Sequence, residues 1–404
     1  MSLLPKRIAS LRPDPGSLRS DALAGVPGAI ASVPDGMASA VLVGVNPVYG
    51  LYASMAGPIG GGLAVSTRLM VVTTTTASAL AAGSALSGFS GSERSDALFV
   101  LSALAGVMMI AAGVLRLGRF TRFVSVSVLT GFLTGVALNI VLGQLGDLLG
   151  SPEKGSPALA KAWNVITHLS EMSLTAAAVG VSALVLMALL SRTRVASVAS
   201  LIALLVPTLL SFGASDLVRV EDSGQIPNGI PTPHLPHLSL LSSLDLLTGA
   251  AAVAVIVLVQ GTGVAEGAPN PDGSLSSPNR DFIAQGIGNL ASGLFRGQPV
   301  GGSVGQTALN VAAGARGRWA SIFSGVWMLL ILVLFSGAVG KVPIPTLAAV
   351  LIFAAASSLR VGRIDTVLRT GLPSQIAFFA TLTGTLFLPV TAAVGIGVVL
   401  SLLL

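Results

Sequence analysis

The chain has 404 residues, of which 52% are hydrophobic and only 9% are charged, whereas about a quarter of the residues of soluble domains carry charge. The mean hydropathy is +0.87, and the sequence contains no cysteine, which excludes disulfides, thiol chemistry and cysteine-ligated metal sites. The net charge of +6 comes from basic residues scattered between apolar runs, a pattern typical of membrane orientation signals rather than of nucleic-acid binding. These features predict an all-α polytopic membrane protein.

The first 20 residues contain four basic side chains and several prolines, which predicts a cytoplasmic N-terminal arm over residues 1–20. A signal peptide is the alternative, because residues 22–33 followed by residues 37–40 imitate an apolar region with a cleavage site. The apolar stretch resumes at once, which favours the arm.

About fourteen membrane segments follow, in two halves over residues 21–212 and 243–404, with an external polar loop over 213–242 between them. Residues 152–171 form an amphipathic connector at the membrane interface. The predicted segments are 21–43, 47–65, 70–87, 96–115, 121–149, 173–191, 195–212, 243–265, 280–296, 299–314, 319–337, 343–358, 373–388 and 390–404.

The basic residues predict the orientation of these segments. With the N-terminus inside, 16 of the 22 Lys and Arg residues fall on the inner side and six on the outer side, as the positive-inside rule requires. An even number of segments then places both termini in the cytoplasm. We expect the protein in the inner (plasma) membrane of the cell.

The stretch Pro299–Ala313 differs from the other apolar segments because it carries Gly301, Gly302 and Gly305 together with hydrogen-bonding side chains. It reads as an extended strand followed by a helix that begins near Ser303. Its apolar part covers about ten residues, too few to cross a core of about 30 Å, so it must be buried in protein or face a watery cavity. The N–H groups and the dipole at the start of such a half-helix suit an anion.

A similar stretch occurs in the first half at Val71–Leu80, where Thr73–Thr76 precede a short helix of small residues. Interrupted segments in corresponding positions of two halves indicate a transport site. The alternative is that the threonines hydrogen-bond to their own helix. The glycine-rich partner favours the functional interpretation.

Four stretches resemble the sulfate permease (SulP) family of anion transporters. Pro34–Ala40 and the run Pro-Val-Tyr-Gly-Leu-Tyr within Gly44–Ser54 resemble its first two helices. Asn279–Asn289 resembles its Asn-x-Glu-Leu-x-x-Gly-x-x-Asn stretch, and Gly302–Asn310 with Ala313–Arg316 resembles the motif that opens its tenth helix. The resemblance runs from about Asp21 to the C-terminus.

The resemblance implies fourteen spans in two inverted seven-helix repeats, a core and a gate domain, elevator-type alternating access and a homodimer. It implies an anion site between the third and tenth helices, here two half-helices with short extended stretches. Members normally continue into a cytoplasmic STAS domain, which we expect to be absent because this chain ends at Leu404. The residues predicted to bind the anion are Thr73, Thr74, Thr75, Thr76, Gln260, Gly302, Ser303, Val304, Gly305, Gln306 and Thr307.

Several positions differ from the family pattern. Gly305 and Gln306 replace a common Ser-Arg pair, which removes a fixed cation, and Thr73-Thr74 replaces Gly-Pro. Gln260 stands where a Glu is common, and Asp35 where a Gln is common. These differences leave the substrate and the coupling ion open.

Asp35 lies inside the first segment, where an ionised side chain is costly and is functional by default. We predict that it binds and releases the coupling proton. The alternative is that Pro34-Asp35 interrupts the helix near a watery surface. Gln260 and Gln306 can orient an anion or hold helices together.

The predicted function is secondary active, proton-coupled transport of a small carboxylate such as fumarate. Transport of sulfate or bicarbonate, an uncoupled anion channel or voltage-responsive protein, and a structural or regulatory subunit are the alternatives. No histidine lies within a segment and Asp35 has no mid-span carboxylate partner, so the residues for an intramembrane hydrolase are lacking. We expect no cofactor, metal or nucleic acid, and an anion, the proton, lipid and a second copy of the chain as partners.

Overall fold

The structure is a computed structural model that describes residues 15–118, 125–151, 158–214, 216–223, 231–234, 243–359 and 361–388. The described chain is mostly helical, with two short strands. The elements of the first half are α2 (Pro15–Val43), α3 (Val48–Ala64), β1 (Val72–Thr74), α4 (Thr76–Ala85), α5 (Gly91–Val114), α6 (Val126–Gly143), α7 (Leu145–Leu149), α8 (Ala158–Thr167), η2 (Leu169–Glu171), α9 (Leu174–Leu190), η3 (Ala196–Val198) and α10 (Ala199–Leu210). Those of the second half are η4 (Val220–Ser223), α11 (Leu244–Gly267), α12 (Pro278–Leu294), β2 (Val300–Gly302), α13 (Val304–Ala312), α14 (Trp319–Gly340), α15 (Ile344–Ser358), α16 (Val361–Thr370) and α17 (Leu372–Phe387).

The predicted segments and the helices agree except at a few places. Helix α2 already includes Pro15, the first of the described residues, and so overlaps the predicted arm over residues 1–20. It also continues through Pro34 rather than breaking there. Helix α16 was not predicted, since it is amphipathic and short. The predicted segment 390–404 lies outside the described residues.

Four described helices are long and apolar enough to cross a membrane: Gly16–Val43, Gly91–Val114, Val126–Leu149 and Leu244–Gly267. The bent pair α15 and α16 would make a fifth. The other apolar helices are shorter, and α14 is interrupted by a non-helical residue at Phe335, so the count of fourteen spans and the inverted repeats stay predictions.

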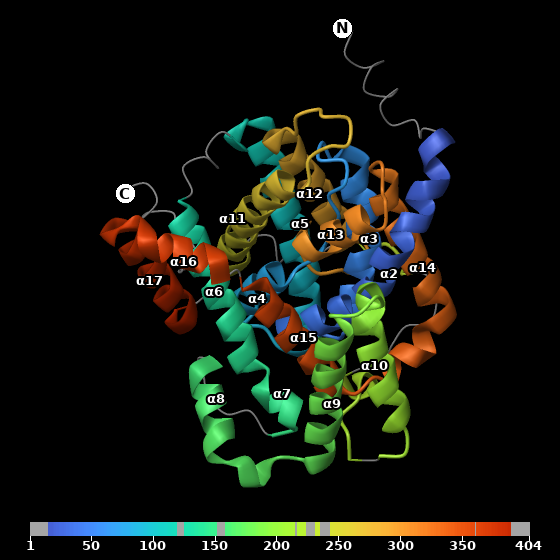
Figure 1. The fold of residues 1–404 in the computed structure, drawn as a ribbon, viewed down its shortest axis with the longest axis vertical. Coiled ribbons are helices and arrows are strands. Elements are labelled where there is room, and N and C mark those ends of the chain that lie inside the picture. The colour runs from blue at the N-terminus through green and yellow to red at the C-terminus, as the bar shows by residue number, and fades with distance from the viewer. Residues whose placement is uncertain are drawn as a thin grey trace, which may run out of the picture.

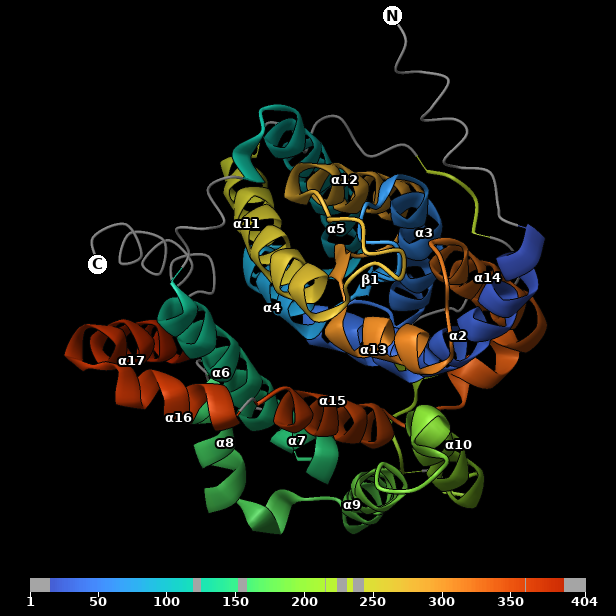
Figure 2. The ribbon, with the colours of Figure 1, turned by 45° about the horizontal axis from the view of Figure 1, so that its top comes forward.

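The helices form two groups in space, and each group takes helices from both halves of the chain. Helices α2–α5 pack with α11–α14 in one group, and α6, α7, α9, α10 and α15–α17 form the second group (Figures 1 and 2). The two groups meet along α2, which contacts α15 and α10, and where α4 contacts α6. We call them the first and the second helix group.

Close backbone contacts hold the first helix group together. A Cβ atom on Gly106 of α5 would lie 2.7 Å from the carbonyl oxygen of Gly286 in α12, and a Cβ on Gly293 would lie 2.8 Å from that of Phe99. Gly113, seven residues after Gly106, lies equally close to the backbone of α12. Residues seven apart share one face of a helix, so only glycine leaves room for this contact along its length.

The two strands pair with each other at the centre of the first helix group. β1 pairs with β2 in antiparallel register, with Val72 opposite Gly302 and Thr74 opposite Val300. The backbone at Ser303 extends the ladder, because its N–H donates to Val71 at 2.9 Å. This pairing places the starts of α4 and α13 side by side.

Candidate functional site

Helix α4 starts with a capped turn. Thr75 is extended (φ −135°, ψ 146°), and its hydroxyl accepts from the N–H of Ser78 at 3.2 Å. The first intrahelical bond runs from Ala79 N–H to the Thr75 carbonyl at 3.0 Å. The N–H groups of Thr76 and Ala77 therefore precede the helical hydrogen-bond ladder and have no partner within the helix.

Helix α13 repeats this arrangement. Ser303 is extended (φ −90°, ψ 123°), its hydroxyl accepts from Gln306 N–H at 3.3 Å, and Thr307 N–H makes the first intrahelical bond to its carbonyl at 3.0 Å. Val304 and Gly305 are left with N–H groups outside the ladder. Two half-helices thus present two N–H donors each, together with the partial positive charge of each N-terminus.

All four of these residues line one cavity of about 470 Å³. A Cβ atom on Gly305 would meet nothing within 4 Å, so the start of α13 faces open space. The other walls come from α2, α6, α11, α15 and α16. The lining residues outside the half-helices are Asp35, Ala38, Ser39, Leu129, Leu133, Val136, Val259, Gln260, Gly263, Val350, Leu351, Ala354, Ser357, Ser358 and Arg363.

The structure brings most of the predicted site residues to this cavity. Those that line it are Asp35, Thr74, Thr75, Thr76, Gln260, Ser303, Val304 and Gly305. The Thr75 hydroxyl lies 3.3 Å from the Gln260 side-chain oxygen, which joins α4 to α11 at the cavity wall. The hydroxyl of Thr74 lies 3.3 Å from that of Ser54 on α3.

Four predicted residues lie behind the cavity instead. Thr73 is in β1 and is 1% exposed, and the N–H of Gly302 donates to the Gln285 side chain at 2.9 Å. The Thr307 hydroxyl accepts from Val71 N–H at 3.1 Å. The Gln285 side chain already accepts from the N–H of Gly302, so this N–H is not available to an anion.

Gln306 is the fourth, and it connects the half-helix to Asp35. Its side-chain Nε2 donates to the Asp35 carboxylate at 3.0 Å, across 271 residues of sequence. Gln306 is 2% exposed, and among the described residues its Oε1 has no hydrogen-bond partner. This hydrogen bond therefore joins the first turn of α13 to a carboxylate on α2.

A polar stripe on α12, which we had not predicted to act at the site, holds β2 and the segment that leads into β1. Asn289 Nδ2 donates to the Val300 carbonyl at 2.7 Å and its Oδ1 accepts from Val300 N–H at 3.0 Å, so the side chain acts as a neighbouring strand. Gln285 accepts from β2 one turn earlier, and Asp281 lies another turn earlier on the same face. The i, i+4, i+8 spacing of these three buried polar side chains was a signal visible in the sequence.

Asp281 fixes the segment that leads into β1. Its carboxylate accepts from the N–H and hydroxyl groups of Ser66 and Thr67 at 2.6–3.1 Å. It is 2% exposed, and four charge-assisted hydrogen bonds compensate for burying it. The same helix face therefore positions both half-helices.

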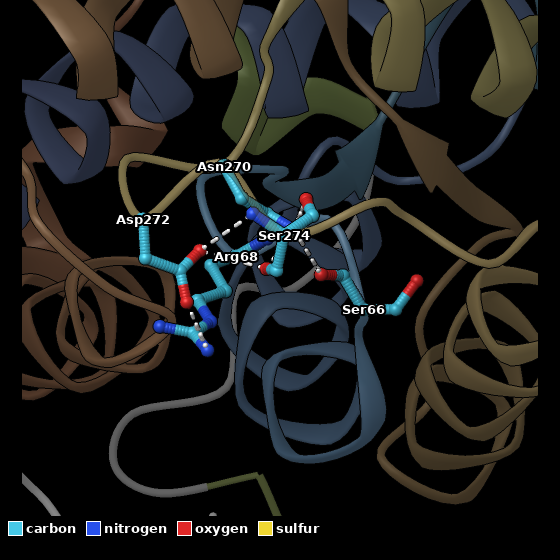
Figure 3. Close-up of polar contacts among 5 residues, drawn as sticks. All are labelled: Ser66, Arg68, Asn270, Asp272 and Ser274. Carbon is cyan, nitrogen blue, oxygen red and sulfur yellow. Dashed lines mark hydrogen bonds and ion pairs between the residues drawn. The ribbon is translucent and has the colours of Figure 1, made fainter.

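The loop between α11 and α12 also binds the segment that leads into β1, at Ser66 and Arg68. Asn270 accepts from Arg68 N–H at 2.7 Å and donates to the Ser66 carbonyl at 3.1 Å, and Arg68 pairs with Asp272 at 2.8 Å (Figure 3). Hydrogen bonds from Ser274, and then the Arg68 guanidinium, hold the pKa of the exposed Asp272 carboxyl below its ordinary value. The turn before β1 is thus held from both sides.

A second cavity of about 670 Å³ lies on the other side of the contact between the helix groups. On α2, Ala38 lines the first cavity and Val41 lines the second. On α15, Val350 lines the first cavity and Ile344 lines the second. Leu347 lies between the last two and is fully buried. About one helical turn of apolar contact therefore separates the two cavities.

Comparison with known proteins identifies relatives over nearly the whole chain. The profile described as "Sulfate permease family" matches residues 18–369. A protein of Mycobacterium tuberculosis named "Probable sulfate transporter" is 29% identical over 390 residues, covering 96% of this chain and 70% of its own length.

Two solved structures share the fold at 20% sequence identity. The transmembrane domain of a cyanobacterial bicarbonate transporter, BicA, superposes with a TM-score of 0.80 over 96% of this chain and 98% of its own. The murine anion transporter Slc26a9, in its inward-facing state, superposes with a TM-score of 0.85 over all of this chain and 70% of its own.

Proposed function

Because the chain belongs to the sulfate permease family of anion transporters, we propose that it is a secondary active transporter that carries a small anion by elevator-type alternating access. The observation that carries the proposal is the pair of half-helices, because the four residues whose N–H groups precede their hydrogen-bond ladders all line one cavity. Helix N-termini bind anions without a fixed cation, because aligned peptide dipoles place about half a positive charge at each. Their joint effect replaces the arginine that the family often has at the position of Gln306.

The two cavities support alternating access. They lie on opposite sides of one apolar contact between the helix groups, so sliding one group along the other would close one cavity and open the other. The half-helices both belong to the first helix group, so the anion would travel with that group.

Asp35 supports proton coupling. Its carboxylate lines the anion cavity and accepts a hydrogen bond from Gln306 in the first turn of α13. An ionised Asp35 repels an anion at the half-helices, and protonation removes this repulsion, so the two ligands would bind together.

Our proposed cargo is a small carboxylate such as fumarate. The names of the relatives make sulfate and bicarbonate the alternatives. Neutral N–H donors recognise charge and size and are compatible with all three anions. We propose in addition that the protein lies in the plasma membrane with both termini inside, and that it forms a homodimer.

The test is uptake into proteoliposomes. Purified protein is reconstituted, and labelled fumarate, sulfate and bicarbonate are offered with and without an inward proton gradient. We expect saturable uptake of one anion that exceeds its equilibrium level and acidifies the lumen. Conductance that follows voltage alone, without accumulation, would favour the uncoupled channel, and absence of any anion flux would refute transport.

A further inference from the structure

Arg363 is the single basic side chain among the described residues that line the anion cavity. It lies on α16, an amphipathic helix beside α6 and α17 in the second helix group (Figure 2). The half-helices supply neutral donors, from N–H and hydroxyl groups, and α2 adds the Asp35 carboxylate. Among the described lining residues, the positively charged side chain therefore comes from the second helix group.

The other charged side chains of α16 have a different environment. Asp365 and Arg369 form an i, i+4 ion pair at 2.9 Å, and neither lines the cavity. Arg363 makes no hydrogen bond or ion pair within the described part of the chain. Its neighbours at the cavity wall are the hydroxyl residues Ser357 and Ser358 at the end of α15.

The walls between Arg363 and the half-helices are largely apolar, with Leu129, Leu133 and Val136 on α6 and Val350 on α15. Low-dielectric walls focus the field of a fixed charge along the space they enclose. Arg363 is exposed at the edge of this cavity, and the apolar walls direct its field toward the half-helices.

We infer that Arg363 is a specificity-determining residue of the anion site, which favours doubly charged over singly charged anions at the cavity mouth formed by α15 and α16. The inference rests on the proposed anion transport. Arg363 lies on the second helix group, so its contribution exists only while the cavity includes α16. It would weaken when the first group moves away, which promotes release on the opposite side.

The size of the effect follows from the charge of the ligand. A unit charge about 8 Å from the guanidinium, in a medium of dielectric constant about 40, gains a factor of about five in affinity. A doubly charged anion gains the square of this factor, about 25-fold. A larger loss of affinity for doubly than for singly charged anions would therefore distinguish an electrostatic role of Arg363 from a purely structural one.

The experiment measures dissociation constants in detergent by titration calorimetry, which needs no transport. Two anion pairs of similar size but different charge are used, sulfate with bicarbonate and fumarate with monomethyl fumarate. Arg363→Gln should weaken the doubly charged anions about 25-fold and the singly charged ones about fivefold, and Arg363→Lys should restore most of the difference. Arg369→Gln, on the same helix but outside the cavity, is the matched control and should leave all four values unchanged.

Equal weakening of both charge classes, or no change in Arg363→Gln, would overturn the inference while leaving anion transport intact. If the wild-type protein binds none of the four anions, the proposed function itself is refuted. Rising salt should also reduce the wild-type preference, and a preference that resists salt would argue against Arg363 as its source.

Discussion

Replacing Val304 by proline removes one anion donor from the site while keeping the helix. Proline is favoured at the first position of a helix, where its missing N–H is not needed by the hydrogen-bond ladder. The preceding Ser303 already has the extended backbone that proline requires (φ −90°, ψ 123°). The Ser303 cap to the N–H of Gln306 is untouched.

The expected loss can be stated from the chemistry of a single contact. A hydrogen bond to a charged group contributes about 1.5–3 kcal/mol, so Val304→Pro should weaken the anion by about 10- to 150-fold. We would measure the KM of uptake in proteoliposomes and the dissociation constant in detergent. Both should rise together, because the lost contact binds the ligand itself.

Two control variants separate the donor from other effects. Val304→Ala shortens the side chain but keeps the N–H, so its affinity should stay near wild type. Leu174→Pro places a proline at the first position of α9, which has the same kind of serine cap and lies in the second helix group. If Val304→Pro folds as well as Leu174→Pro and binds the anion like wild type, the half-helix N–H groups are not the anion site.

Three further perturbations test other parts of the argument. Asp35→Asn should keep anion binding but lose accumulation driven by a proton gradient, as measured by uptake with an imposed pH difference. Asn289→Leu leaves two buried backbone groups of β2 unpaired, which costs about 2–6 kcal/mol, so both the melting temperature and the anion affinity should fall. Its control is Asn139→Leu, which removes one hydrogen bond to α17 and should lower only the melting temperature. In this cysteine-free chain, Glu171→Cys should be labelled by an impermeant reagent only from outside, and Arg369→Cys only from the cytoplasm.

Each of these has a result that would count against it. Accumulation against the gradient by Asp35→Asn would remove that residue from coupling. An Asn289→Leu protein with unchanged affinity would mean that β2 keeps its position without the α12 stripe. Labelling of both cysteines from one side would contradict the topology.

The sequence was a good guide where local chemistry decides the structure. Ser303 and the glycines before it predicted a strand followed by a half-helix, and α13 does begin at Val304. The threonine run was ambiguous, because Thr75 serves both as the helix cap and as a partner for Gln260. Local pattern alone cannot tell these roles apart.

Contacts between distant parts of the chain were beyond local pattern. The bond from Gln306 to Asp35 spans 271 residues, and it gives the half-buried carboxylate on α2 a donor from α13. Arg363 appeared only as an orientation signal, since its place at the cavity depends on how α16 folds back against α6. The α12 stripe had the right spacing, but its partners lie on strands that the helix reaches only in the folded protein.

The glycine contact between α5 and α12 has a consequence for how the protein is made. Some 180 residues separate the end of α5 from the end of α12, which ribosomes need about 10–35 s to synthesise. During that time the groove along Gly106 and Gly113 faces lipid, with its partner not yet in the bilayer. The nascent first half must therefore persist in the membrane without docking to itself or to other chains.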